Sequence, residues 1–400
     1  MATAQPIFIH SLFRSASTYF FHEFRGIETF CCYEEPFNES LAALNHSWRH
    51  YRLLESPNAP GLRHPRLDRP YFYEYWQARE HLQGLFRASF AYDHYFARDG
   101  ELPAPQKAWL SAIIAHAPAR PVLQFCRSSG RVAALRSLFG GKHLHLWREP
   151  RVQWWSYKTA DYFDSVSRRI YRSAHLPEAL RALRRMAHLP RSRYRHPQPR
   201  GNYLSFYGLW LDAWLRLSAH SDLSINVDRI AVFPAENSEC ARRLSELVGC
   251  SIDLAGIRTS GMVFAAAEEP FYAEVEQTVH ELFARTGHAT GAALQAASAA
   301  AAQARDAHNH LAHDVTTEQN LRLAAMSLMR CLAGGGRPGG SRWPQRWYPK
   351  RFHDYVRWAL QRLQRRPHPG AQPVDHPAAP HADSGAGGVQ TPPATGPKLG

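Results

Sequence analysis

Residues Pro6–Arg25 read PIFIHSLFRSASTYFFHEFR, and this stretch decides the fold. The apolar run Pro6–Ile9 is long enough for a buried strand, and aromatic residues recur at helical spacing over Tyr19–Phe24. Between them lies a polar turn in which Ser17 and Thr18 favour the start of a helix. Such a turn points free backbone N–H groups at one spot, and the helix dipole attracts a phosphate to it. The stretch therefore predicts an anion-binding turn between a strand and a helix.

The turn lacks the pattern of ordinary nucleotide kinases, which needs a glycine, four residues and then Gly-Lys-Ser/Thr. It has instead a basic residue, Ser, a small residue, Ser/Thr and Thr, present here as Arg14, Ser15, Ala16, Ser17 and Thr18. This order resembles the 5′-phosphosulfate loop of the sulfotransferases that use 3′-phosphoadenosine 5′-phosphosulfate (PAPS). The resemblance implies that these residues bind the donor and that Arg14 neutralises charge on the leaving oxygen. Ala16 departs from the family, which usually has glycine there, and alanine tolerates positive φ poorly.

A second motif lies in Leu144–Lys158, which reads LHLWREPRVQWWSYK. An apolar strand is expected to end in a charged turn, and Pro150 then occupies the first position of a helix, where proline is tolerated. Arg148 and Ser156 are eight residues apart, as in the sulfotransferase segment that holds the 3′-phosphate of PAPS. The two motifs together identify the chain as similar to the PAPS-dependent sulfotransferases, and closest in motif style to bacterial and carbohydrate sulfotransferases.

The resemblance covers little of the chain beyond Gly249. In many family members a later loop closes over the 3′-phosphate, and the nearby candidates here are Arg258, Thr259, Ser260 and Gly261. We assign them no role from the sequence.

Strand-like and helical runs alternate five times along the chain. The expected strands are Pro6–Ile9, Glu28–Tyr33, Pro121–Cys126, the start of Leu144–Lys158, and Leu223–Phe233. This alternation predicts an α/β fold with a parallel sheet in three layers. The resemblance implies that the five-stranded parallel sheet is related to the P-loop nucleotide-binding folds. A helical C-terminal extension is expected over Pro270–Leu332.

We expect one large domain, because 400 residues with 44% hydrophobic content can bury one extended core. The predicted organisation is a sulfotransferase-like α/β domain with helical insertions at 1–335, a basic aromatic helical segment at 336–366 and a disordered tail at 367–400. The tail is rich in Pro, Ala and Gly and shows no hydrophobic period.

The net charge of +14 is concentrated in two stretches. Arg168–Arg200 holds ten arginines against the single acid Glu178, and Ser341–Arg366 holds eight basic residues against the single acid Asp354. Concentrated arginine indicates an anionic partner, which can be the phosphosulfate donor, an acidic glycan, a lipid headgroup or nucleic acid. The alternative for each stretch is a solvated basic face, and nucleic acid is not expected as a partner.

A candidate base follows the second expected strand, where the sequence reads Tyr33-Glu34-Glu35-Pro36. Carbohydrate sulfotransferases have a similar Tyr-Glu-Pro segment, in which the Glu takes the proton of the acceptor hydroxyl in several members. Sulfuryl transfer is an in-line displacement, so the base must reach the acceptor oxygen opposite the leaving phosphate. The resemblance implies this role for Glu35. Glu34 is the alternative, and strand alternation puts the two side chains on opposite sides.

Basic residues also follow the third expected strand, Pro121–Cys126. Open α/β sheets bind ligands at the carboxyl ends of their strands. Many members of the resembled family have a basic residue here that faces the sulfate or the acceptor. Arg127 is the candidate for substrate binding, and Arg131 is the second choice.

The function expected from the resemblance is transfer of a sulfuryl group from PAPS to a hydroxyl, on a small molecule, a carbohydrate or a glycoconjugate. Arg14 and Glu35 would be the catalytic residues, and no metal is needed. His308, His310 and His313 do not predict a metal site, because only His310 and His313 share a helix face. The alternatives are a P-loop-like kinase, a non-catalytic protein that binds an anionic membrane or nucleic acid, and a degenerate relative that binds nucleotide without turnover.

The sequence predicts a cytoplasmic protein, with association at the inner face of a membrane as an alternative. Six cysteines without a C-x-x-C pair give no disulfide framework, which favours a reducing compartment. No apolar run approaches the roughly 18 to 20 residues that a membrane span needs.

Overall fold

The computed structural model describes residues 5–55, 69–98, 100–158, 162–188, 199–259 and 269–313. All of them belong to one compact unit, Met1–Pro344. The segments predicted at 336–366 and 367–400 lie outside the described residues.

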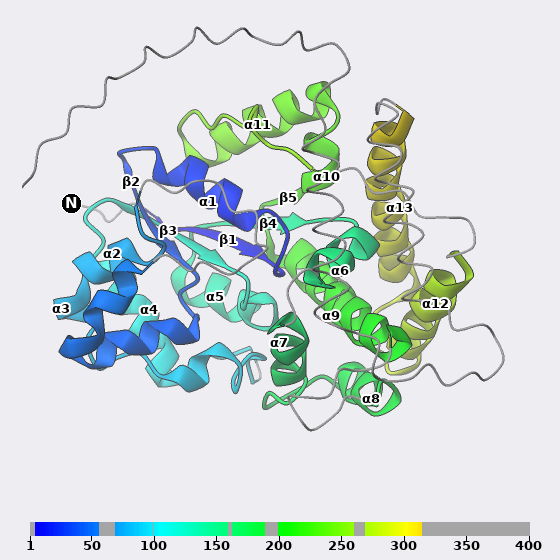
Figure 1. The fold of residues 1–400 in the computed structure, drawn as a ribbon, viewed down its shortest axis with the longest axis horizontal. Helices are drawn as coiled ribbons and strands as arrows, with labels where there is room; N and C mark the ends of the chain where they lie inside the picture. The colour runs from blue at the N-terminus through cyan, green and yellow to red at the C-terminus, as the bar shows by residue number, and fades with distance from the viewer. Residues whose placement is uncertain are drawn as a thin grey trace, which may run out of the picture. The chain divides into compact units, whose positions relative to one another are not determined.

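Five parallel strands form one sheet in the order β2-β3-β1-β4-β5 (Figure 1). This confirms the predicted α/β class and the five-stranded parallel sheet. β1 is the central strand, and its Ile9 pairs with Gln124 on one side and Leu144 on the other. The strands are β1 (Ile7–Ser11), β2 (Phe30–Glu34), β3 (Arg120–Phe125), β4 (Lys142–Trp147) and β5 (Leu223–Asn226).

Helices cover both faces of the sheet, as expected for three layers (Figure 1). Ile7 and Ile9 pack against α1 and α11 on one face of the sheet. Phe8 points to the opposite face, where α4 and α5 pack. Helix α9 contacts β1, β4 and β5. These helices are α1 (Ser17–Arg25), α4 (Ala104–Ala115), α5 (Val132–Phe139), α9 (Pro199–His220) and α11 (Pro234–Val248).

The remaining helices lie in the connections between the strands and after β5. Between β2 and β3 they are η1 (Glu39–Asn45), η2 (Ser47–Leu54), α2 (Tyr73–Gln77), α3 (Arg79–Leu82) and η3 (Ala88–Ala91). The others are η4 (Ser129–Arg131), α6 (Pro150–Lys158), α7 (Tyr162–Ile170), α8 (Glu178–Met186), α10 (Val227–Ile230), α12 (Glu269–Arg285) and α13 (Gly291–His313).

The strand order reverses the direction of the connections beside the central strand. The chain leaves β1 through α1 toward β2 at one edge of the sheet, and it leaves β4 toward β5 at the other edge. In open α/β sheets, ligands bind where neighbouring strands send their connections in opposite directions. In this fold that position lies between the carboxyl ends of β1 and β4.

The fifth strand is shorter than predicted. A strand over Leu223–Phe233 was expected, but β5 ends at Asn226 and α10 follows at once. The Asn226 side-chain oxygen accepts hydrogen bonds from the backbone N–H groups of Asp228 and Arg229, each at 3.2 Å. Asparagine is a strong helix N-cap, and this cap overrides the apolar pattern that suggested a longer strand.

Helix α9 is buried along most of its length, because every residue from Asn202 to Ala213 is buried. It packs between the sheet and helices α8, α12 and α13. A helix surrounded on all sides belongs to the core.

Among the residues described, no helix combines the length and the apolar character that a membrane crossing requires.

Candidate functional site

The turn between β1 and α1 has an unusual backbone. Arg14 and Ala16 adopt left-handed φ angles of 67° and 58°. Ala16 is thus an alanine in a conformation that normally suits glycine, at a cost of roughly 1 kcal/mol. The position where the sequence departs from the resembled family is therefore a position that favours glycine physically.

The same turn leaves the start of α1 open to an anion. Ala16 is the N-cap of α1 and makes no side-chain cap, and the first turn of this helix contains no acidic residue. The first N–H groups of a helix, here those of Ser17 and Thr18, have no partner within the helix. Their dipoles give this end a positive potential.

The turns after β1 and β4 contact each other. The Arg14 Nε donates to the Ser156 Oγ at 2.9 Å, and an Arg148 terminal nitrogen lies 3.5 Å from the Arg14 carbonyl oxygen. The structure therefore brings Arg14, Arg148 and Ser156 into one place, although about 140 residues separate the two motifs.

Helix α6 also holds the turn between β1 and α1 through Gln153. The buried Gln153 side chain donates to the Phe13 carbonyl oxygen at 2.7 Å and to the Ser15 Oγ at 2.9 Å. Both Ser15 and Gln153 are almost inaccessible to solvent. The second motif thus fixes the conformation of the first.

Asp228 orients the Arg148 side chain. Its Oδ1 accepts from the Arg148 Nε at 2.9 Å, and the Thr259 hydroxyl bridges the two side chains at 2.8 and 3.0 Å. Its Oδ2 accepts from the Glu149 N–H at 2.7 Å. Burial alone would raise the pKa of this carboxyl, but the neighbouring Arg148 guanidinium and His308 ring hold the pKa well below its usual range.

The sequence reasoning missed Asp228, because it placed this residue inside a strand. The available signal was Asn226, a helix N-cap residue two positions earlier. Thr259, named from the sequence only as a nearby candidate, lies against Arg148. Ser260 and Gly261 lie outside the described residues.

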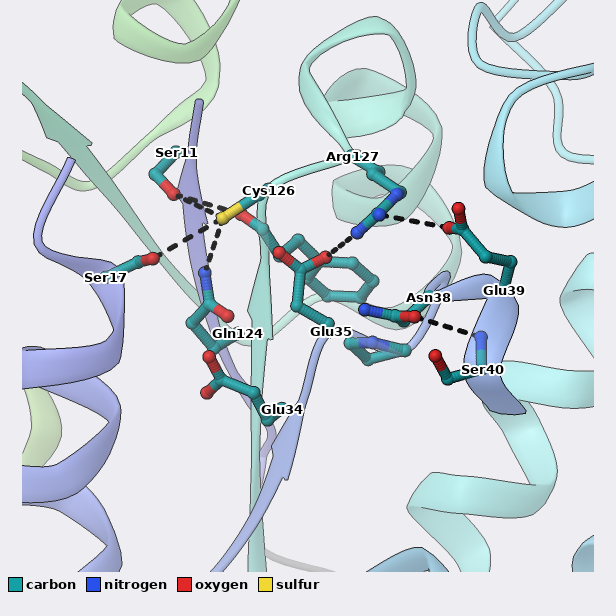
Figure 2. A network of polar contacts seen from close by, with 12 residues as sticks. Ser11, Ser17, Glu34, Glu35, Asn38, Glu39, Ser40, Gln124, Cys126 and Arg127 are labelled. Carbon is teal, nitrogen blue, oxygen red and sulfur yellow. Dashed lines mark hydrogen bonds and ion pairs between the residues drawn. The ribbon is translucent and has the colours of Figure 1, made fainter. Parts of the chain in front are cut away.

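Glu35 and Arg127 form a buried ion pair at the carboxyl ends of β2 and β3 (Figure 2). An Arg127 terminal nitrogen lies 2.6 Å from the Glu35 Oε2, and the other lies 3.1 Å from both Glu39 and the Tyr92 hydroxyl. The guanidinium also stacks 4.8 Å from the Phe13 ring centre. Arg127 therefore faces Glu35 and fixes the candidate base.

Glu34 points away from this pair, toward Gln124 (Figure 2). The Tyr71 hydroxyl donates to its carboxyl, which is fully buried. Burial raises the pKa of Glu34, which favours the neutral acid. A neutral carboxylic acid is a poor base, so the geometry favours Glu35 over Glu34.

Cys126 lies between Glu35 and the side chains of Ser11 and Ser17 (Figure 2). Its Sγ lies 3.4 Å from the hydroxyl oxygens of both Ser11 and Ser17. Burial, together with the nearby Glu35 carboxylate, raises the pKa of the thiol well above its usual value. The thiol therefore stays neutral and serves packing rather than nucleophilic chemistry.

The Arg131 side chain is enclosed by backbone carbonyl groups of the protein itself. Its guanidinium is fully buried and donates to the carbonyl oxygens of Phe90, His94 and Arg127. Burial lowers its pKa to about 9. The second choice for substrate binding is therefore a structural arginine that holds a loop against the β3 turn.

The histidines of α13 differ in environment. His308 is fully buried and its Nε2 lies 3.2 Å from the Asp228 Oδ1, whereas His310 is exposed and lies beside the Phe233 ring. Within the described ranges, no group of three or more His, Cys, Asp or Glu side chains is placed to hold a metal ion.

Comparison of the chain with models of protein families, with curated proteins and with solved structures finds no match. The site is therefore interpreted from its own geometry.

The strain at Ala16 can be measured by substitution. Ala16→Gly should raise the free energy of unfolding by about 1 kcal/mol, because glycine adopts the left-handed region without penalty. The matched control is Ala133→Gly on the exposed side of α5, which should lower it by about 1 kcal/mol. Urea unfolding of both variants gives the comparison. Equal losses in the two variants would contradict the left-handed conformation of Ala16.

The buried ion pair gives a second test. Arg127→Met leaves the buried Glu35 carboxylate without its guanidinium, and it should lower the free energy of unfolding by about 3–5 kcal/mol. The control is Arg169→Met, because Arg169 pairs with Glu39 at 2.9 Å but is half exposed, and its loss should cost at most about 1 kcal/mol. Similar losses in chemical denaturation would show that Arg127 does not carry a buried pair.

Proposed function

We propose that this protein is a sulfotransferase that moves a sulfuryl group from PAPS to a hydroxyl of a carbohydrate or glycoconjugate, on a fold related to the P-loop nucleotide-binding folds. The observation that carries the proposal is the contact between the turns after β1 and β4, through Arg14, Ser156 and Arg148. Two anion-binding turns side by side suit a ligand with two separated phosphates, and PAPS is such a ligand.

In this proposal the two turns bind opposite ends of the donor. The open N–H groups at the start of α1 and the Arg14 guanidinium would hold the 5′-phosphosulfate. Arg148 and Ser156 would hold the 3′-phosphate. Asp228 accepts from the Nε of Arg148, whereas a terminal nitrogen of Arg148 approaches the Arg14 carbonyl oxygen in the turn after β1. This terminal nitrogen is the one that would face the donor.

The reaction is a direct displacement at sulfur. The acceptor oxygen attacks the sulfur, and the bond between sulfur and the bridging oxygen breaks with its electron pair remaining on the 5′-phosphate. Glu35 takes the proton of the acceptor hydroxyl, and Arg14 stabilises the charge that develops on the bridging oxygen. Arg127 fixes the direction of the Glu35 carboxylate through their 2.6 Å contact.

A kinase on a related fold is the nearest alternative. The turn lacks the Gly-Lys pair that cradles ATP phosphates, which argues against it. A non-catalytic anion-binding protein is the other alternative, and it would bind its partners with steep salt dependence but without selectivity for one nucleotide.

Donor selectivity distinguishes these functions. Adenosine 3′,5′-bisphosphate should stabilise the protein against thermal unfolding more than ATP with Mg²⁺ or AMP, by about 2.7 kcal/mol at a concentration about 100-fold above its Kd. A labelled-sulfate screen of glycan and small-molecule hydroxyl acceptors then tests turnover. Equal stabilisation by the three nucleotides, or preference for ATP, would contradict the proposal.

Substitutions of Arg14 and Arg148 should affect different steps, turnover for Arg14 and donor binding for Arg148. Arg14→Ala should lower kcat by about 10²-fold or more, because one preorganised charge at the leaving oxygen is lost. Arg148→Ala should mainly raise the Kd of the bisphosphate. Wild-type turnover in the first variant would remove Arg14 from the mechanism, and an unchanged Kd in the second would reject the 3′-phosphate assignment.

A further inference from the structure

Helix α13 contacts the turn after β4 through Arg305 and the start of α10, after β5, through His308. The Arg305 Nε lies 3.2 Å from the Glu149 Oε1, and the His308 Nε2 lies 3.2 Å from the Asp228 Oδ1. Glu149, Asp228 and His308 are all fully buried. The two contacts join residues 156 and 80 positions apart in the chain. One involves Glu149, which follows Arg148 in the chain, and the other involves Asp228, which accepts a hydrogen bond from Arg148.

His308 acts on the carboxylate that orients Arg148. The Asp228 Oδ1 accepts from Arg148 and Thr259 and lies against the His308 ring. A buried carboxylate keeps a fixed position only when hydrogen-bond donors or cations surround it. With His308 removed, Asp228 loses a neighbour of the same Oδ1 that accepts from Arg148, and the direction of the guanidinium is less restrained.

Arg305 acts on the next residue of the same turn. The Glu149 carboxylate caps α6 by accepting from the Val152 N–H at 2.7 Å, and α6 carries Ser156. Burial raises the pKa of Glu149, and the Arg305 guanidinium opposes this effect. Without Arg305, Glu149 loses its ion-pair partner, and the carboxylate that caps the first turn of α6 is less restrained.

We propose that Arg305 and His308 are positioning residues for the 3′-phosphate of the donor, and that they act on Arg148 through Glu149 and Asp228. This proposal rests on the proposed function, since it assigns a 3′-phosphate to Arg148. It makes α13 part of the donor site, although α13 follows β5 by about 65 residues in the chain.

The expected signature is loss of selectivity for the 3′-phosphate alone. AMP carries the 5′-phosphate but lacks the 3′-phosphate, so the ratio of the AMP Kd to the bisphosphate Kd isolates the Arg148 turn. Titration calorimetry should show this ratio falling about tenfold or more in Arg305→Met and His308→Gln, the size typical of partners that orient a binding residue. The Kd of AMP should stay near its wild-type value.

Two further variants complete the experiment. Asn309→Ala, next to His308 but exposed on α13, should keep the wild-type ratio. Arg305→Lys retains the charge and should recover part of the ratio lost in Arg305→Met. Circular dichroism and thermal unfolding establish that each variant is folded, and if Arg305→Met does not fold, Arg305→Lys and His308→Gln carry the test.

The outcomes separate this proposal from the one on which it rests. A wild-type protein that binds the bisphosphate no better than AMP overturns the proposed function. A wild-type preference that survives unchanged in the folded Arg305 and His308 variants overturns only the positioning role of α13. A parallel loss of AMP and bisphosphate affinity would also reject it, because a general structural defect would weaken both ligands equally.

Discussion

The buried carboxylate of Asp228 is the interaction on which the site depends. It lies at the start of α10, just after β5, and it accepts from Arg148, Thr259 and the Glu149 N–H while the His308 ring lies against it. A buried charge is tolerated only with such a set of partners. By satisfying this carboxylate, the protein ties the end of β4 to the end of β5 and sets the direction of the arginine that meets the β1 turn.

Backbone strain gathers at the same edge of the sheet. Arg14, Ala16 and Glu35 are three of the non-glycine residues with positive φ in the described part of the chain, and all three follow β1 or β2. Strained conformations persist where the surroundings determine them, and they occur most often at binding and catalytic sites. Here the Gln153 side chain supports the β1 turn, and Arg127 holds Glu35.

Local patterns were sufficient to predict four of the strands and the arginines at the ends of β1, β3 and β4, but not the end of β5, where the Asn226 cap starts α10. The apolar run before Arg14 and the eight-residue spacing from Arg148 to Ser156 depend on neighbouring residues only, and the structure brings these side chains together. The partners of the arginines could not be predicted in this way. Arg127 pairs with Glu35 across 92 positions and Arg148 with Asp228 across 80, and such distant partners are determined by the packing of whole elements.

The most direct test of the account is a crystal structure of the protein with adenosine 3′,5′-bisphosphate. The account predicts the 5′-phosphate at the start of α1, against the N–H groups of Ser17 and Thr18, and the 3′-phosphate against Arg148 and Ser156. A nucleotide bound at any other surface, or with both phosphates away from these two turns, would contradict it.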